Sequence, residues 1–291
     1  MSMSIQKIER LRRKRKTSSK REFIQMRQRF PERLNIVSEG DSWFAYPPKW
    51  IIVGKPSNLI SHISKWTNRK ANFYSMASNG DEAVDMVSGK QKHQLVDVLK
   101  WHTKRKNRKP VDLLLFSGGG NDVVGDNDFE RFLNHDGTSY TTAEQCVNIS
   151  RLDRKVKQIG LAFHELLDIR DHYSPKTIVL THTYDYPYPS DIGGVFLGGL
   201  IKTKAWMKRF MDDVNIKEDL QADVIKIFME KIGNELMSIS SNRDKFIVVD
   251  TRKTLKGEKE WLNEIHPTSD GFEVIAKKIF KEMEDEFPVL T

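Results

Sequence analysis

The sequence has a single cysteine and lacks any long apolar run. One cysteine, Cys146, excludes an intrachain disulfide and a zinc site built from cysteines. Because it lies at the start of an amphipathic helical pattern, we expect it to be a small buried side chain. No apolar stretch approaches the roughly 18 residues that a membrane span needs, and no signal-peptide-like segment follows the basic start. We therefore expect a cytoplasmic protein.

Acidic residues are scarce in only one segment. The net charge is +8, but residues 1–34 hold twelve Lys/Arg and three Asp/Glu, whereas the remainder holds 36 basic and 37 acidic residues. The near-neutral remainder is not typical of a nucleic-acid-binding surface, so we expect no specific nucleic-acid partner. We interpret residues 1–30 as a basic arm, either solvated and helical or flexible. Its simplest role is a solubilising extension, and the alternative is weak attraction to an anionic surface.

From residue 31 to 291 apolar strands alternate with helical patterns, which indicates one domain. The predicted strands lie in residues 33–40, 71–80, 111–122, 176–187 and 244–253, and the predicted helices in 57–66, 81–105, 143–171, 206–240 and 269–287. This alternation predicts a three-layer α/β/α sandwich with a mainly parallel five-stranded sheet of flavodoxin-like type. Ligands bind beyond the carboxyl ends of such strands.

Polar and glycine-rich turns follow the first four predicted strands. Ser42 comes directly after Gly40 and Asp41, where its hydroxyl leaves the strand end, although a Gly-Asp-Ser tripeptide also forms ordinary turns. Gly80 lies in an Asn-Gly turn, where its N–H can approach a ligand. Asn121 follows three glycines, and its amide can donate to an oxyanion. The glycine run matches neither of two common phosphate-binding motifs, G-x-x-x-x-G-K-[ST] and G-x-G-x-x-G. We therefore favour the oxyanion interpretation.

His266 has the most constrained surroundings of the eight histidines. Pro267 follows it and ends any preceding helix, and Ser269 or Asp270 can cap the next one. The ring is therefore well placed to project from a loop. A serine nucleophile needs such a base within hydrogen-bonding distance.

In this order, the GDS, SNGD, GGGND and NEIHP segments resemble the conserved blocks of the SGNH (GDSL-type) hydrolases, over residues 34–287. The resemblance implies a nucleophilic Ser42, a base at His266, and an oxyanion hole formed by the N–H groups of Ser42 and Gly80 and the amide of Asn121. It implies hydrolysis of esters without a metal or cofactor. The substrate is then a small-molecule, lipid or glycan ester, and a carbohydrate O-deacetylase is the alternative within the same fold.

One residue departs from that pattern. Asn263 stands three residues before His266, where these enzymes usually have aspartate. Asn263 then orients the imidazole in a slower enzyme, or a backbone carbonyl does so, or a carboxylate such as Glu264 replaces it. A further interpretation is a degenerate site in a non-catalytic binding module.

Residues 184–215 contain a glycine-punctuated apolar segment, which we interpret as a candidate lid or insertion, or equally as a loop and helix that pack on the core. Asp41, His182 and Asp185 are candidate pocket residues, although the last two also fit a packed surface loop. The sequence does not indicate an oligomeric state.

Overall fold

A computed structural model of the chain describes residues 4–47, 58–104, 108–125, 128–196, 201–202 and 204–291. Its main sheet has five parallel strands in the order β2-β1-β3-β4-β7. The strands are β1 (Leu34–Gly40), β2 (Ala71–Ser75), β3 (Leu113–Ser117), β4 (Ile178–His182) and β7 (Phe246–Val249). All five fall in the predicted segments, and their order is the flavodoxin-like one. The predicted fold class is confirmed.

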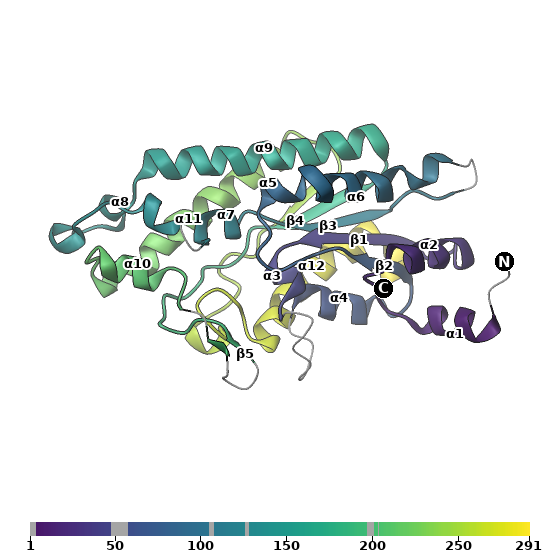
Figure 1. The fold of residues 1–291 in the computed structure, drawn as a ribbon, viewed down its shortest axis with the longest axis horizontal. Helices are drawn as coiled ribbons and strands as arrows, with labels where there is room; N and C mark the ends of the chain where they lie inside the picture. The colour runs from purple at the N-terminus through teal and green to yellow at the C-terminus, as the bar shows by residue number, and fades with distance from the viewer. Residues whose placement is uncertain (1–3, 48–57, 105–107, 126–127, 197–200, 203) are drawn as a thin grey trace.

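Helices cover both faces of this sheet, as Figure 1 shows. The long helices α9 and α11 pack together with α5 and α6 on one face, and α4 packs against α12 on the other. The β3 strand between these layers is buried along its whole length, which explains its continuous run of apolar residues. The helices are α1 (Ile5–Arg13), α2 (Lys20–Arg29), α3 (Ser42–Ala45), α4 (Leu59–Trp66), α5 (Ala83–Met86), α6 (Gly89–Leu99), α7 (Asn121–Val124), α8 (Ala143–Cys146), α9 (Ile149–Tyr173), α10 (Lys208–Asp213), α11 (Glu218–Ser240) and α12 (Ser269–Glu286).

Residues 4–30 form two helices that pack at the edge of the sheet, whereas their composition suggests an arm separate from the core. Thr17 forms a one-residue parallel bridge with Tyr74 of the edge strand β2. Phe23 of α2 is buried in the main core, and Leu11 and Met26 are buried between α1 and α2. Scattered apolar residues thus attach the segment to the sheet edge, and most of its basic side chains face outward. The domain boundary near residue 30 stays a prediction.

Three of the predicted helices are interrupted. The segment 81–105 divides after Met86, and Gly89, with a φ of +46°, begins the second helix. The segment 206–240 divides around Asn215, which has a φ of +59°. The segment 143–171 divides into α8 and α9, and Cys146 at the end of α8 is fully buried as expected. A left-handed residue stops a helix because the next turn cannot continue its hydrogen bonds.

Within the candidate lid, the described backbone forms a small antiparallel pair, β5 (Val195–Phe196) with β6 (Ile201–Lys202), followed by α10. Across the described parts of the chain, no helix has the length and apolar character required to cross a membrane.

Candidate active site

Ser42 lies at the carboxyl edge of the sheet, at the start of α3. The strand β1 ends at Gly40, and a Cβ atom there would come within 2.9 Å of Ser117 on β3. Glycine is therefore required where the two strands approach. The Asp41 side chain then caps α3 by accepting a hydrogen bond from the Trp43 N–H at 3.0 Å. This cap turns the chain from strand to helix and places Ser42 in the first turn.

His266 contacts Ser42 across 224 residues of sequence. The Nε2 atom of His266 lies 2.7 Å from the Ser42 Oγ, and its Nδ1 lies 3.0 Å from the Asn263 Oδ1. The Asn263 Oδ1 also accepts the backbone N–H groups of Ile265 at 3.2 Å and His266 at 2.9 Å. The two backbone N–H donors fix the orientation of this amide, so that its oxygen faces the imidazole. The Nδ1 of His266 therefore carries the proton, and its Nε2 is free to accept the serine hydroxyl proton.

Two aromatic rings surround the imidazole. Tyr46 stacks on His266 with a centroid distance of 4.1 Å and an interplanar angle of 18°, and Trp206 meets it edge-on at 5.9 Å. The Tyr46 N–H bonds to the Ser42 carbonyl at 2.7 Å, one helical turn along α3. Burial lowers the pKa of His266 to about 3, so the resting imidazole is neutral at physiological pH.

The loop that carries His266 is attached to α3 and to its own helix. The indole N–H of Trp43 donates to the Ile265 carbonyl at 3.1 Å. The backbone N–H of Leu262 bonds to the His266 carbonyl at 2.8 Å and closes the loop. Thr268 caps α12, rather than Ser269 or Asp270 as expected from the sequence. These contacts fix the imidazole relative to the serine.

Glu264 does not orient His266. Its buried carboxylate accepts the backbone N–H groups of Trp206, Met207 at 2.8 Å and Lys208 at 2.6 Å. Burial raises the pKa of this carboxyl to about 7, although those N–H groups oppose the shift. Glu264 is therefore not the carboxylate that replaces the usual aspartate beside the histidine. Its carboxylate attaches residues 206–208 to the histidine loop.

Asn121 is the first residue of α7 and lines the same cavity as Ser42. Its Nδ2 donates one hydrogen bond to the Asp81 carbonyl at 3.0 Å, which joins the second and third sequence blocks. Gly80 adopts a φ of +84°, a conformation that favours glycine. Ser42 and Asn121 both line a cavity of about 330 Å³, whose lining residues do not include Gly80. The structure thus places two of the three predicted oxyanion residues in one cavity.

Of the other predicted pocket residues, only Asp41 lines this cavity. Its carboxylate accepts hydrogen bonds from Trp43, from the Ser117 hydroxyl at 2.8 Å and from the Tyr184 hydroxyl. Burial raises its pKa to about 7. The Asp41 side chain therefore organises the wall of the cavity.

The structure places His182 and Asp185 outside the lining of this cavity, where their side chains make structural contacts. The buried His182 ring stacks on Trp43, with its Nε2 3.1 Å from the Ser117 hydroxyl and its Nδ1 accepting the Tyr184 N–H. The Asp185 carboxylate accepts backbone N–H groups of the 253–255 turn. In both cases the chain turns inward directly after β4 and uses these polar groups to satisfy buried backbone donors.

Sequence reasoning missed the aromatic residues Trp43, Tyr46, Tyr184 and Trp206. Tyr46 had a recognisable signal, because a residue four positions after Ser42 returns to the same face of a helix. The contact of Trp206 with His266 had no signal in the sequence, because it depends on the folding of a distant segment. Among the described residues, no group of three or more His, Cys, Asp or Glu side chains is arranged to hold a metal.

Comparison with protein-family models and with curated proteins gives no match. Comparison with solved structures gives an extracellular lipase from Streptomyces rimosus, with a TM-score of 0.53 and 16% identity over 86% of this chain and 99% of that one. A lipase from goat rumen metagenome, Lip_vut3, has a TM-score of 0.54 and 15% identity over 85% of this chain and 96% of that one. With its parallel sheet, its four ordered sequence blocks and these two structural relatives, the chain has the SGNH (GDSL-type) hydrolase fold.

Proposed function

We propose that this chain is a serine hydrolase that cleaves carboxylic esters. The observation that carries the proposal is the Ser42–His266–Asn263 arrangement, with 2.7 Å between the hydroxyl and the imidazole. This is the geometry that a serine needs for activation by a general base. The lipases with which the chain shares its fold support the same reaction class.

The reaction begins when the Ser42 Oγ attacks the ester carbonyl carbon while its proton passes to the His266 Nε2. The carbonyl oxygen becomes an oxyanion, which accepts hydrogen bonds from the Ser42 N–H and from the second amide N–H of Asn121. The first turn of α3 supplies such a donor, because the first N–H groups of a helix have no partner within the helix. Gly80, which does not line the cavity, is the third proposed donor.

The intermediate collapses when the bond between carbonyl carbon and alcohol oxygen breaks and His266 returns the proton to the leaving alcohol. The acyl group is then bonded to the Ser42 Oγ. Water enters, loses its proton to His266 and attacks the acyl carbon. The bond between the acyl carbon and the Ser42 Oγ then breaks, His266 gives its proton to that oxygen, and the carboxylic acid leaves. Apart from the substrate and this water, each step uses groups of this chain.

Asn263 positions the imidazole but carries no charge to stabilise the imidazolium. In a Ser-His-Asp protease, replacing the equivalent aspartate by asparagine lowers the rate about 10⁴-fold because the imidazole takes the wrong tautomer. The contact between the Asn263 Oδ1 and the His266 Nδ1 keeps the correct tautomer here, so only the loss of the charge remains. The face of the Tyr46 ring, stacked at 4.1 Å, stabilises a cation by about 0.5–2 kcal/mol. Tyr46 therefore offsets part of the missing carboxylate, and we expect a working but slow enzyme.

The experiment is the turnover of p-nitrophenyl acetate or butyrate by purified protein. We expect Ser42→Ala to abolish turnover while the circular dichroism spectrum stays unchanged. A matched control is Ser139→Ala at an exposed serine, which we expect to keep full activity. Equal activity of Ser42→Ala and the wild type would reject the proposal and favour a binding module with this fold.

A further inference from the structure

The cavity beside Ser42 is narrow. It encloses about 330 Å³ including the part that opens to solvent, but the centre of a water molecule reaches only about 20 Å³ of it. A single water needs about 10–15 Å³ by that measure, so the closed part admits roughly one group of methyl size. Asp41, Ser42 and Asn121 form its polar wall, and Trp43, Val124, Tyr184 and Met229 form most of its apolar wall.

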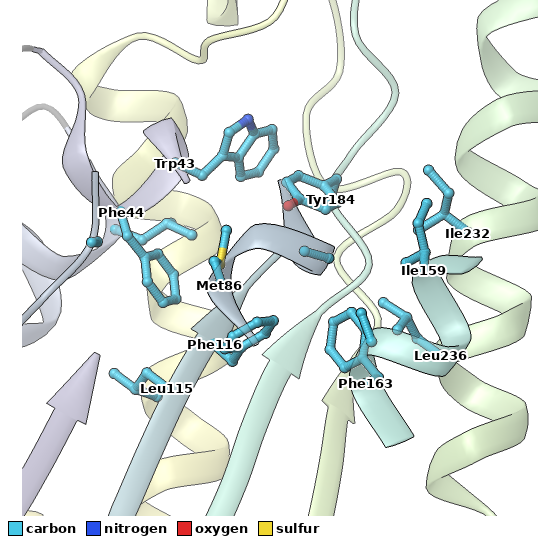
Figure 2. Packing of buried hydrophobic residues seen from close by; sticks show 14 of the residues in the cluster. Trp43, Phe44, Met86, Leu115, Phe116, Ile159, Phe163, Tyr184, Ile232 and Leu236 are labelled. Atoms are coloured by element: carbon cyan, nitrogen blue, oxygen red, sulfur yellow. The ribbon is translucent and has the colours of Figure 1, made fainter. Parts of the chain in front are cut away.

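Two of those apolar walls are rigid. The Trp43 and Tyr184 rings meet edge-on at 5.0 Å, and Figure 2 shows both above the buried core. The Trp43 indole donates to the Ile265 carbonyl, and the Tyr184 hydroxyl donates to buried Asp41. A Cβ atom added at Gly120 would approach the Tyr184 ring to 3.2 Å, so the backbone already packs tightly there. Widening the cavity on this side would break hydrogen bonds whose partners are buried.

The order of events in the proposed reaction determines which part of an ester enters this cavity. The alcohol leaves first and water must then reach the acyl carbon, so the alcohol side has to face solvent. The acyl group stays bonded to the Ser42 Oγ through both steps. A narrow apolar cavity adjoining that oxygen therefore suits the acyl group.

We propose that this cavity is the acyl site and that it limits the substrate to acetyl esters or esters of similarly short acids. The proposal rests on the proposed function. It leaves the alcohol portion unrestricted, because that portion extends into solvent. An acetylated sugar or another small acetate fits this rule, and an ester of a long-chain fatty acid does not.

Met229 of α11 forms part of the cavity wall. Its side chain is an unbranched thioether, so it can be shortened without breaking a hydrogen bond. We expect Met229→Ala to lengthen the cavity and to shift the preference toward longer acyl groups. Met283→Ala in α12 is the matched control, because it removes an equally buried methionine from a helix outside the cavity lining. Both variants lose similar core packing, so a difference between them reports on the cavity.

The experiment measures kcat/KM for p-nitrophenyl acetate, butyrate and octanoate. For the wild type we expect a fall of at least 100-fold from acetate to octanoate, since one methylene in a fitted pocket changes specificity about 10–200-fold. We expect Met229→Ala to raise the butyrate-to-acetate ratio at least about 10-fold and Met283→Ala to leave it unchanged. Turnover of octanoate equal to that of acetate would overturn the proposal, even if the variant failed to fold.

The two proposals fail differently. Ester turnover that requires Ser42 but shows no preference for short acyl groups, or an unchanged ratio in folded Met229→Ala, would overturn only the acyl site. Absence of any Ser42-dependent turnover would overturn the hydrolase proposal and the acyl site with it.

Discussion

The Asn263 Oδ1 accepts the Nδ1–H of His266 at 3.0 Å and the backbone N–H of the same residue at 2.9 Å. One amide oxygen thus holds both the ring and the backbone of the histidine. This contact selects the tautomer in which Nε2 faces the Ser42 hydroxyl. The arrangement preserves the geometry of a Ser-His-Asp triad while leaving out its negative charge.

The first prediction concerns that missing charge. We expect Asn263→Asp to raise kcat at least about 10-fold, because a carboxylate stabilises the imidazolium formed in the transition state. Burial lowers the pKa of His266 to about 3 in the present protein. The carboxylate opposes this effect, so the acid limb of the pH–rate profile should move to higher pH in the variant.

Asn263→Ala is the companion variant, and we expect it to lower kcat because the imidazole loses its positioning contact. A purely structural role for residue 263 predicts a changed melting temperature in both variants and an unmoved acid limb in Asn263→Asp. That result would contradict the account of the triad.

The second prediction concerns Tyr46 as a positioning residue. We expect Tyr46→Leu to lower kcat about 2- to 30-fold, because the imidazolium loses the aromatic face worth about 0.5–2 kcal/mol. Tyr46→Phe keeps the ring and should retain most of the activity. Steady-state kinetics with p-nitrophenyl acetate measures both.

The same substitution in an Asn263→Asp background provides the control. Since a carboxylate then supplies most of the stabilisation, Tyr46→Leu should cost less there than in the parent. Equal losses in both backgrounds, or equal activity of the Leu and Phe variants, would show that the ring does not act on the imidazolium.

The third prediction concerns the attachment of residues 206–208. Because Glu264 accepts three backbone N–H groups there, we expect Glu264→Gln to lower the melting temperature by a few degrees and kcat/KM about 10-fold. The loss of activity follows because Trp206, which contacts His266, moves with this segment. Glu258→Gln at an exposed site of the preceding turn is the control. Unchanged kinetics in Glu264→Gln would mean that the segment does not help to hold the imidazole.

The fourth prediction concerns the pH dependence of stability. Burial raises the pKa of Glu39 in β1 to about 8, so folding favours its protonated form. The stabilisation is fully present below the ordinary pKa near 4.5 and is lost as the pH rises through about 8. Gln mimics the protonated acid, so Glu39→Gln should gain melting temperature over the wild type at pH 9 and gain little at pH 5.

Glu32→Gln at an exposed position is the control for that measurement, and it should show no such difference. His182 acts in the opposite direction, because burial lowers its pKa to about 3 and stability is lost as the pH falls below about 6.5. A wild-type melting temperature that keeps rising between pH 7 and pH 9 would contradict the burial of a neutral Glu39.

The sheet could be predicted because its strands are short apolar runs, each followed by a change in residue composition. The run LLLFS ends at Ser117 and is followed by three glycines, and the first strand ends at the Gly40-Asp41-Ser42 turn. Parallel strands place all their carboxyl ends on one edge, so the meeting of Ser42 with Asn121 follows from topology. The His266 contact follows from its position before the last helix and from the resemblance to the SGNH blocks.

Other features depend on contacts between distant segments, which local patterns do not encode. The apolar residues of α1 and α2 are too scattered to indicate burial, yet the β2 edge supplies a surface for them. His182 lies among other polar residues in the sequence, so its burial has no local signal. Only the folded structure shows that the Trp43 ring stacks on it. The role of Glu264 likewise could be recognised only once the position of residues 206–208 was known.

The most direct measurement is covalent labelling of the intact protein with a fluorophosphonate probe, followed by peptide mass spectrometry. We expect one modified residue, Ser42, labelled in the wild type and not in Ser42→Ala, with slower labelling in His266→Ala. A wild-type protein that stays unlabelled under conditions that modify a known serine esterase, or that is labelled at another serine, would contradict the account.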